Sequence, residues 1–337
     1  MKPTDQPALM SEATPFADVP RKRLVLPGQL GTYLGLTLVL VAMIALFGSF
    51  SEYFLTRETF ITIANDIPAL LVMSIGMTFV LIIAGIDLSV GSVLALSAAA
   101  TAAAILQWHW NVAAASALGL LTGLVCGTIT GAVSVAWRLP SFIVSLGMLE
   151  AVRGGAYLVT NSRTQYVGDA ISGLAAPWLG GISVAFVLAV VLVIVAHIVL
   201  TRTVFGRHVV GIGTNEEAMR LAGIDPRPIR IIVFALTGLL AGLAGLMTAA
   251  RLEAADPNAG GGIELQVIAA VVIGGTSLMG GRGSVVNTFF GVLIIAVLEA
   301  GLVQIGANEP SKRIITGCVI VVAVIIDTIR QRRAGIA

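Results

Sequence analysis

The sequence predicts an all-α polytopic membrane protein with about ten transmembrane helices and both termini in the cytoplasm. Of its 337 residues, 57% are hydrophobic and 11% are charged, and the mean hydropathy is +0.98. Soluble domains carry about 45–50% apolar and about 25% charged residues. This composition excludes the water-soluble enzyme classes, and a net charge of +2 gives no indication of nucleic-acid binding.

Ten apolar windows reach or approach the length of about 20 residues that a helix needs to cross a bilayer. They lie at residues 30–50, 66–84, 88–107, 112–137, 140–160, 182–201, 229–250, 263–279, 285–307 and 312–329. The second, eighth and tenth windows are short or interrupted, so ten is an approximate count of spans.

The sequence before the first window predicts a mostly disordered cytoplasmic tail over residues 1–29. The basic cluster Arg21–Lys22–Arg23 precedes an apolar run that is long enough to span and lacks a small-residue cleavage site, unlike a signal peptide. A transmembrane permease domain is expected over residues 30–330, with a cytoplasmic insert at 202–230. A short basic cytoplasmic tail follows at 331–337.

The distribution of lysine and arginine tests this topology. If the N-terminus is cytoplasmic and the spans alternate, the inner segments carry Lys2, Arg21, Lys22, Arg23, Arg138, Arg202, Arg207, Arg220, Arg227, Arg230, Arg282, Arg330, Arg332 and Arg333. The outer segments carry only Arg57, Arg163, Arg251, Lys312 and Arg313. This excess of positive charge inside is typical of membrane proteins, and an even number of spans places both termini together.

The polar insert contains a short helix predicted over residues 215–222. Thr214 and Glu217 have the spacing of a capping box, with Thr214 as the N-cap and Glu217 reaching back to it. Glu216 and Arg220 stand four residues apart in the order that favours an ion pair. Gly223 supplies a left-handed stop.

So short a helix is marginal in water and must pack on another surface. Ala218, Leu221 and Ala222 can share one small apolar face. Two alternatives remain open: the helix rests on its own membrane helices, or it is a docking surface for a cytoplasmic partner.

Two polar, glycine-bearing breaks interrupt the apolar sequence, one in each half of the chain. The first includes Asp87, Ser89 and Gly91, and the second includes Gly274, Gly275, Thr276 and Ser277. Irregular backbone at membrane depth is tolerated where it is buried or lines a cavity. The breaks are therefore either a pathway or gate, or two tight cytoplasmic turns.

The second break, GGTSLMGGRGS at 274–284, is superficially similar to a phosphate-binding loop. Gly281 occupies the position where that motif has lysine, so the chain has no ATP site of its own. The three histidines lack metal-ligand spacing, and no nucleophile elbow occurs. The sequence therefore predicts a protein that is not an enzyme and holds no metal or cofactor.

Charged groups within the windows cost about 2.5–3.5 kcal/mol each at mid-bilayer and need partners. Glu150 and Arg153 stand three residues apart, which predicts an internal ion pair. Asp87 lies near a predicted helix end, where water can reach it. Asp66 and Glu299 have no evident partner in the sequence and could be ligands of a coupling ion.

Four long segments together resemble one family. GTNEEAMRLAGIDPRPIRI (213–231) is similar to the cytoplasmic loop of ribose-type permeases of ATP-binding-cassette (ABC) importers. AGIDLSVGSVLAL (84–96), RLEAADPNAGGGIEL (251–265) and ELQVIAAVVIGGTSLMGGRGSV (264–285) resemble further segments of the same monosaccharide permeases, in the same order.

The resemblance implies the ABC importer permease fold, in a bacterial inner membrane. It also implies three kinds of partner: a second copy of the chain, a periplasmic sugar-binding protein, and a cytoplasmic ATPase that binds ATP and Mg and docks on the insert. The solute would be a monosaccharide or polyol. The alternatives are a secondary transporter driven by protons or sodium through Asp66 and Glu299, a membrane-embedded enzyme, and a passive channel.

Overall fold

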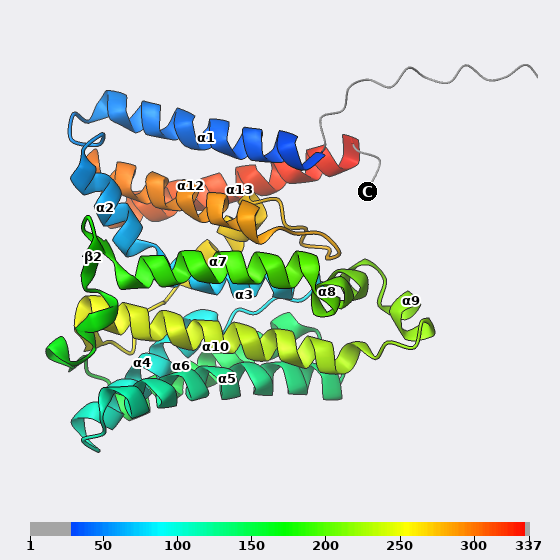
Figure 1. Ribbon diagram of the computed structural model, residues 1–337, viewed down its shortest axis with the longest axis horizontal. Coiled ribbons are helices and arrows are strands. Elements are labelled where there is room, and N and C mark those ends of the chain that lie inside the picture. The colour runs from blue at the N-terminus through cyan, green and yellow to red at the C-terminus, as the bar shows by residue number, and fades with distance from the viewer. Residues whose placement is uncertain (1–27, 334–337) are drawn as a thin grey trace, which may run out of the picture.

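The computed structural model describes residues 28–333, most of which are helical (Figure 1). The predicted tail at 1–29 lies outside the described residues except for positions 28 and 29, which begin the first helix. The basic tail predicted at 331–337 is described only for residues 331–333, and these belong to the last helix.

The elements follow the chain in a simple order, with short strands only in two loops. The helices are α1 (Gly28–Phe50), α2 (Arg57–Asp66), α3 (Pro68–Ile82), α4 (Val90–Leu106), α5 (Val112–Ala136), α6 (Ser141–Thr160), α7 (Val184–Arg202), α8 (Val204–Thr214), α9 (Glu216–Leu221), α10 (Pro226–Leu252), α11 (Ile263–Ile273), α12 (Val285–Gln304) and α13 (Glu309–Arg333), with a 3-10 helix η1 (Gly168–Leu174). Strands β1 (Gln165–Tyr166) and β4 (Ala254–Ala255) pair antiparallel, as do β2 (Pro177–Leu179) and β3 (Ile182–Ser183).

Each of the ten apolar windows contains a helix, which supports a polytopic membrane protein. Among the described residues, six helices are long and apolar enough to cross a bilayer, or seven if α2 and α3, bent by 48°, form one span. Helices α4 and α11 are apolar but shorter. The figure of ten spans and the cytoplasmic placement of both termini stay predictions.

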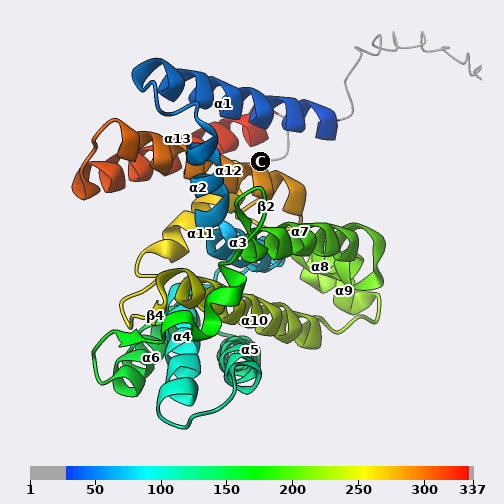
Figure 2. The ribbon, with the colours of Figure 1, turned by 60° about the vertical axis from the view of Figure 1, so that its left-hand side comes forward.

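Helix α3 lies at the centre of the molecule. Its sequence, PALLVMSIGMTFVLI, is apolar on all sides, and every residue except Ala69 is buried. It contacts α7, α10, α11 and α12, which surround it (Figure 2). A helix that is apolar all round is stable only when enclosed, so composition alone accounts for this central position.

Glycine rows hold α5 and α10 close together. Every fourth residue from position 119 to 131 of α5 is glycine, and a Cβ added to Gly123 would lie 2.3 Å from the carbonyl oxygen of Gly238 on α10. A Cβ on Gly127 would lie 2.2 Å from the carbonyl oxygen of Phe234. The two backbones are in direct contact, as expected for glycine rows on membrane helices.

The two ends of the bundle carry different elements (Figure 1). The beginning of α1 and the end of α13 lie at the end that also carries α8 and α9. The opposite end carries α2 and the β2–β3 hairpin. The two ends of the described chain therefore share one side of the molecule, as an even number of crossings requires.

Candidate functional site

The polar insert folds into two short helices, α8 and α9, separated by one extended residue. Asn215 (φ −160°, ψ 98°) is the N-cap of α9, and its Oδ1 accepts a hydrogen bond from the backbone N–H of Ala218 at 2.9 Å. Gly223 (φ +82°) ends the turn that follows α9, so the predicted left-handed stop is confirmed.

The predicted capping box is wrong by one residue. Thr214 is the last residue of α8, and its hydroxyl donates to the carbonyl oxygen of Val210 at 2.8 Å. Glu217 points into solvent, with 72% of its side chain exposed. Because α8 continues through Thr214, the cap falls on Asn215, whose side chain caps a helix at least as well as threonine.

Glu216 connects α9 to the membrane helices. Its Oε1 accepts from Arg220 at 2.6 Å, which confirms the predicted pair, and its Oε2 accepts from Arg230 of α10 at 2.7 Å. Arg230 also donates to the carbonyl oxygen of Ile83, just after α3, at 3.4 Å. Sequence spacing could not identify Arg230, since it lies fourteen positions from Glu216.

The outer face of α9 has no partner among the described residues. Met219 and Ile224 pack inward against the core, whereas Ala218 and Ala222 are exposed and Leu221 is 83% exposed. The predicted small apolar face therefore points away from the bundle. The helix rests on its own bundle through Met219 and Ile224, as the first alternative expects, and its outward apolar face leaves the docking surface a prediction.

The first break is an irregular segment between α3 and α4. Asp87 is 1% exposed, so the expectation that water reaches it is wrong. Its Oδ1 accepts from the backbone N–H of Ser89 at 2.9 Å and from the Ser89 hydroxyl at 2.6 Å. At the start of α4, Gly91 allows close approach of the segment before α11, because a Cβ there would lie 2.3 Å from the carbonyl oxygen of Gly260.

The second break forms a tight turn between α11 and α12. The backbone N–H of Ser277 donates to the carbonyl oxygen of Arg282 at 3.0 Å, and that of Gly280 donates to Ser277 at 3.2 Å. Gly275 adopts φ +83°, and Thr276 and Ser277 are buried. A Cβ at Gly274 would lie 2.7 Å from the carbonyl oxygen of Asn287, which explains why this position is glycine. A gating role for either break stays a prediction.

The insert, the second break and the end of α3 meet at one place, which we call the glycine junction (Ile82, Gly213 and Gly281). The backbone N–H of Gly281 donates to the carbonyl oxygen of Ile82 at 2.8 Å. A Cβ on Gly213, near the end of α8, would lie 1.6 Å from that oxygen and 2.6 Å from the Gly281 nitrogen. The insert therefore contacts the end of the central helix α3 backbone to backbone, with no flexible side chain between them.

The two acids proposed for a coupling ion have partners in the structure. Asp66 forms an ion pair with Arg251 of α10, and both side chains are about half exposed. Glu299 accepts a hydrogen bond from the side-chain amide of Gln266 at 2.6 Å. These contacts account for both carboxylates without a coupling ion.

The predicted Glu150–Arg153 ion pair is wrong. The Arg153 guanidinium donates instead to the carbonyl oxygens of Pro257 at 2.7 Å and Ala259 at 2.8 Å, while Glu150 is exposed. These carbonyls lie in the non-helical segment between α10 and α11. Backbone acceptors outside regular structure need a donor, and the arginine fork satisfies two of them at once.

Replacing Arg153 with methionine is expected to loosen the segment at 253–262. Each charge-assisted hydrogen bond contributes about 1.5–3 kcal/mol, and R153M removes two. We expect faster cleavage of this segment by a non-specific protease in detergent and a lower unfolding temperature. R153K, which can still donate to a carbonyl, should fall between R153M and wild type; cleavage of R153M at the wild-type rate would contradict the assignment.

Comparison with known proteins shows which family the chain resembles. The family model described as "Branched-chain amino acid transport system / permease component" matches residues 59–324. The chain is 38% identical over 299 residues to the ribose import permease protein RbsC of Escherichia coli K12, covering 87% of this chain and 93% of that protein. It is 35% identical over 308 residues to RbsC of Bacillus subtilis, covering 89% and 92%. It is 34% identical over 297 residues to the D-allose transport system permease protein AlsC of Escherichia coli K12, covering 87% and 90%. No solved structure matches the chain.

Proposed function

The chain belongs to the permease family of RbsC-like ABC importers, and on that basis we propose that it is the membrane subunit of an ATP-driven sugar importer. The relatives that cover most of its length are named for ribose and D-allose import. Sequence identity of 34–38% along the whole membrane region supports a neutral monosaccharide as the solute. As a permease it is a multi-pass protein of the cell membrane that moves solute and does no covalent chemistry.

In this proposal the end that carries α8 and α9 faces the cytoplasm. The support is the excess of basic residues in the segments at that end, among them Arg202, Arg207, Arg220, Arg227 and Arg282. Positively charged loops are retained on the cytoplasmic side during insertion. The opposite end, with α2 and the β2–β3 hairpin, then faces a binding protein that delivers the sugar.

The exposed face of α9 is the site we assign to the ATPase partner, which would bind ATP and Mg. A short helix that presents Ala218, Leu221 and Ala222 to solvent has a small apolar surface suited to contact with another protein. The insert at 202–230 would thus be the cytoplasmic coupling element of a permease domain that spans 30–330. This outward-facing α9 is the observation that carries the proposal.

Two connections would carry motion of the ATPase into the membrane. Arg230 bridges Glu216 to the backbone after α3, and the glycine junction joins the end of α8 to the end of α3. Because α3 is buried on all sides, its movement must displace its neighbours. Packed elements of this kind have discrete arrangements, which suits a switch between outward and inward access. Two copies of the chain would form the pathway between them.

Substituting arginine for Leu221 is expected to abolish ATPase binding without affecting the fold. Leu221 makes no core contact, so the membrane level of L221R should equal that of wild type. A charged side chain at the centre of an apolar contact removes a docking anchor that typically contributes at least about 2 kcal/mol. Co-purification with the ATPase in mild detergent and ATP-dependent sugar uptake should both be lost.

A matched control is Leu55→Arg at the opposite end of the bundle, where leucine is 59% exposed. L55R should still co-purify with the ATPase. Normal ATPase capture by L221R would contradict the docking role. Uptake that survives ATP depletion and collapses with an uncoupler would overturn the importer proposal in favour of a secondary transporter.

The solute class can be tested in the same preparation. The family description names branched-chain amino acids, whereas the relatives are sugar permeases. Uptake of D-ribose or D-allose but not L-leucine is the expected result. The reverse preference would replace the sugar assignment while leaving the importer class in place.

A further inference from the structure

Helix α6 has a charged residue on an exposed face midway along its length. This helix, Ser141–Thr160, is long and apolar enough to cross a bilayer, and it lies at the edge of the bundle beside α4 and α5 (Figure 2). Glu150 is exposed at its middle and has no hydrogen bond or ion pair among the described residues. A carboxylate is very unfavourable against lipid at that depth, so this face must contact water or protein.

The glycines on this face are not explained by packing within the chain. On α5, a Cβ at Gly123 or Gly127 would collide with the backbone of α10. On α6, a Cβ at Gly147 or Gly154 would meet nothing within 4 Å. The space above these two glycines is open in the single chain and is free to accept something else.

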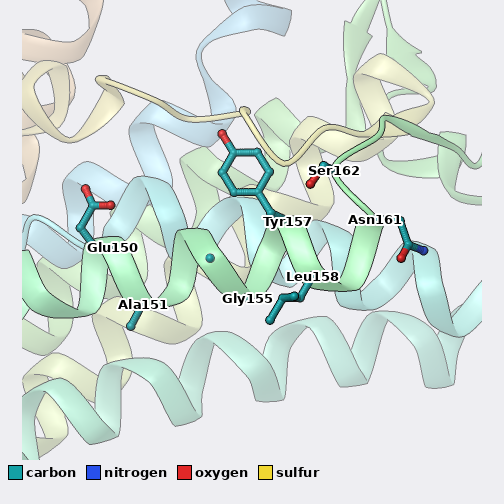
Figure 3. A pocket seen from close by; sticks show the side chains of 8 residues that line it. Glu150, Ala151, Gly155, Tyr157, Leu158, Asn161 and Ser162 are labelled. Carbon is teal, nitrogen blue, oxygen red and sulfur yellow. The ribbon is translucent and has the colours of Figure 1, made fainter.

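A shallow pocket of about 730 Å³ lies above the second of these glycines, Gly154. Glu150, Gly154, Tyr157 and Asn161 line it, together with Leu158 (Figure 3). In Figure 3, Glu150 and Tyr157 project toward the segment before α11. The Tyr157 hydroxyl donates to the Asn258 side-chain oxygen at 2.7 Å, so the segment before α11 is in direct contact with a residue that lines the pocket.

The segment beside the pocket is non-helical and only partly covered. Arg153 holds its carbonyl groups at Pro257 and Ala259, yet Asn258, Gly261 and Gly262 remain exposed. Its Gly260 reaches Gly91 at the start of α4, well inside the bundle. Non-helical backbone at membrane depth does not face lipid; where it is not buried in protein it lines a water-filled cavity.

From these observations we propose that the Glu150 face of α6 and the segment at 256–262 form one wall of the solute pathway. The ligand is a neutral, polyhydroxylated molecule. Glu150 accepts hydrogen bonds from its hydroxyl groups, and the amide of Asn258 and the Tyr157 ring offer a donor and a flat apolar surface. This assignment rests on the proposed sugar importer and adds the residues that contact its solute.

A cysteine at position 154 tests whether the wall is wet and touches solute. G154C is made in a C126A/C318S background, which removes both native thiols, and the full transporter is treated with a charged thiol reagent. We expect rapid labelling of G154C, slowed severalfold by D-ribose or D-allose and unaffected by L-leucine. Ile194→Cys on α7, at a position that is 55% exposed on a long apolar helix, is the slow-labelling control.

Three outcomes would overturn the proposal. The first is labelling as slow as that of I194C, which places the face against lipid. The second is labelling that neither sugar slows. The third is a disulfide between two copies at position 154 that forms at the same rate with and without sugar and leaves no thiol for the reagent, which makes the face a closed subunit contact and not a wall of the pathway. ATP-dependent sugar uptake by the wild-type protein in the same preparation tests the proposed importer function separately. A wrong assignment of the pathway wall is therefore distinguished from a wrong assignment of the function.

Variants of Glu150 give a second, independent measurement. E150Q keeps an acceptor oxygen and should retain most sugar uptake. In E150L the rate of sugar uptake should fall about tenfold, as expected for removal of a hydrogen bond to a charged group. A lipid-facing position predicts the opposite, with E150L at least as active and more stable than wild type. That opposite result would exclude the proposed role.

Discussion

Replacing Gly123 with valine should prevent the protein from folding. A Cβ at this position would lie 2.3 Å from the carbonyl oxygen of Gly238 and 2.9 Å from the backbone of Gly242, so no side chain can move aside to make room. Overpacking in a core costs typically about 1–3 kcal/mol, and a clash between two backbones exceeds that because whole helices must separate. Size-exclusion chromatography of the tagged protein in mild detergent should show the monodisperse peak disappearing.

The control for this prediction is the same substitution where glycine has no neighbour. Gly35 of α1 has nothing within 4 Å of an added Cβ, so G35V should elute and melt like wild type. A folded and stable G123V would mean that α5 and α10 are not held together by their glycine rows. The same comparison applies to Gly127, whose Cβ would meet the Phe234 carbonyl oxygen.

Placing alanine at Gly213 should uncouple the transporter without detaching its ATPase. The added Cβ would lie 1.6 Å from the carbonyl oxygen of Ile82, which forces α8 away from α3 and opens the glycine junction. Coupling free energies between sites are typically about 1–3 kcal/mol, so sugar uptake should fall by about 5-fold to 150-fold. The α9 surface is unchanged, and the ATPase should still co-purify with G213A.

A neighbouring glycine on the same helix provides the control. At Gly211 an added Cβ would meet only the Met219 side chain, with the sulfur at 2.6 Å, and that flexible chain can move. G211A should therefore transport normally. Uptake by G213A close to the wild-type rate would show that motion does not pass through the junction. Loss of the ATPase from G213A would instead assign Gly213 to docking.

Local features of the chain were predictable because they depend on neighbours in sequence. The apolar windows coincide with helices, since composition and period are local properties. The Glu216–Arg220 ion pair and the left-handed stop at Gly223 each depend on residues within about one helical turn, and the structure contains both. The cap moved from Thr214 to Asn215 because two adjacent residues can serve as caps, and the length of α8 decides between them.

Charged groups show where sequence reasoning reaches its limit. Arg153 was assigned to Glu150 three positions away, but it binds carbonyls more than one hundred positions further along the chain. Asp66 pairs with Arg251, which is 185 positions away in sequence. Long charged side chains reach any suitable partner that folding brings near, and spacing along one helix is a weak guide once competing backbone acceptors are present.

The sequence by itself determined that this is a helical membrane protein and which of its segments become helices. These properties follow from hydrophobicity and period, both of which are readable along the chain. Only the tertiary structure decided that the insert, the second glycine break and the end of α3 meet at Gly213, Gly281 and Ile82 and that Arg230 connects α9 to the end of α3. It also left Glu150 facing an open pocket. The physical reason is that such contacts join segments separated by many residues, and only the packing of the whole bundle brings them within a few ångströms.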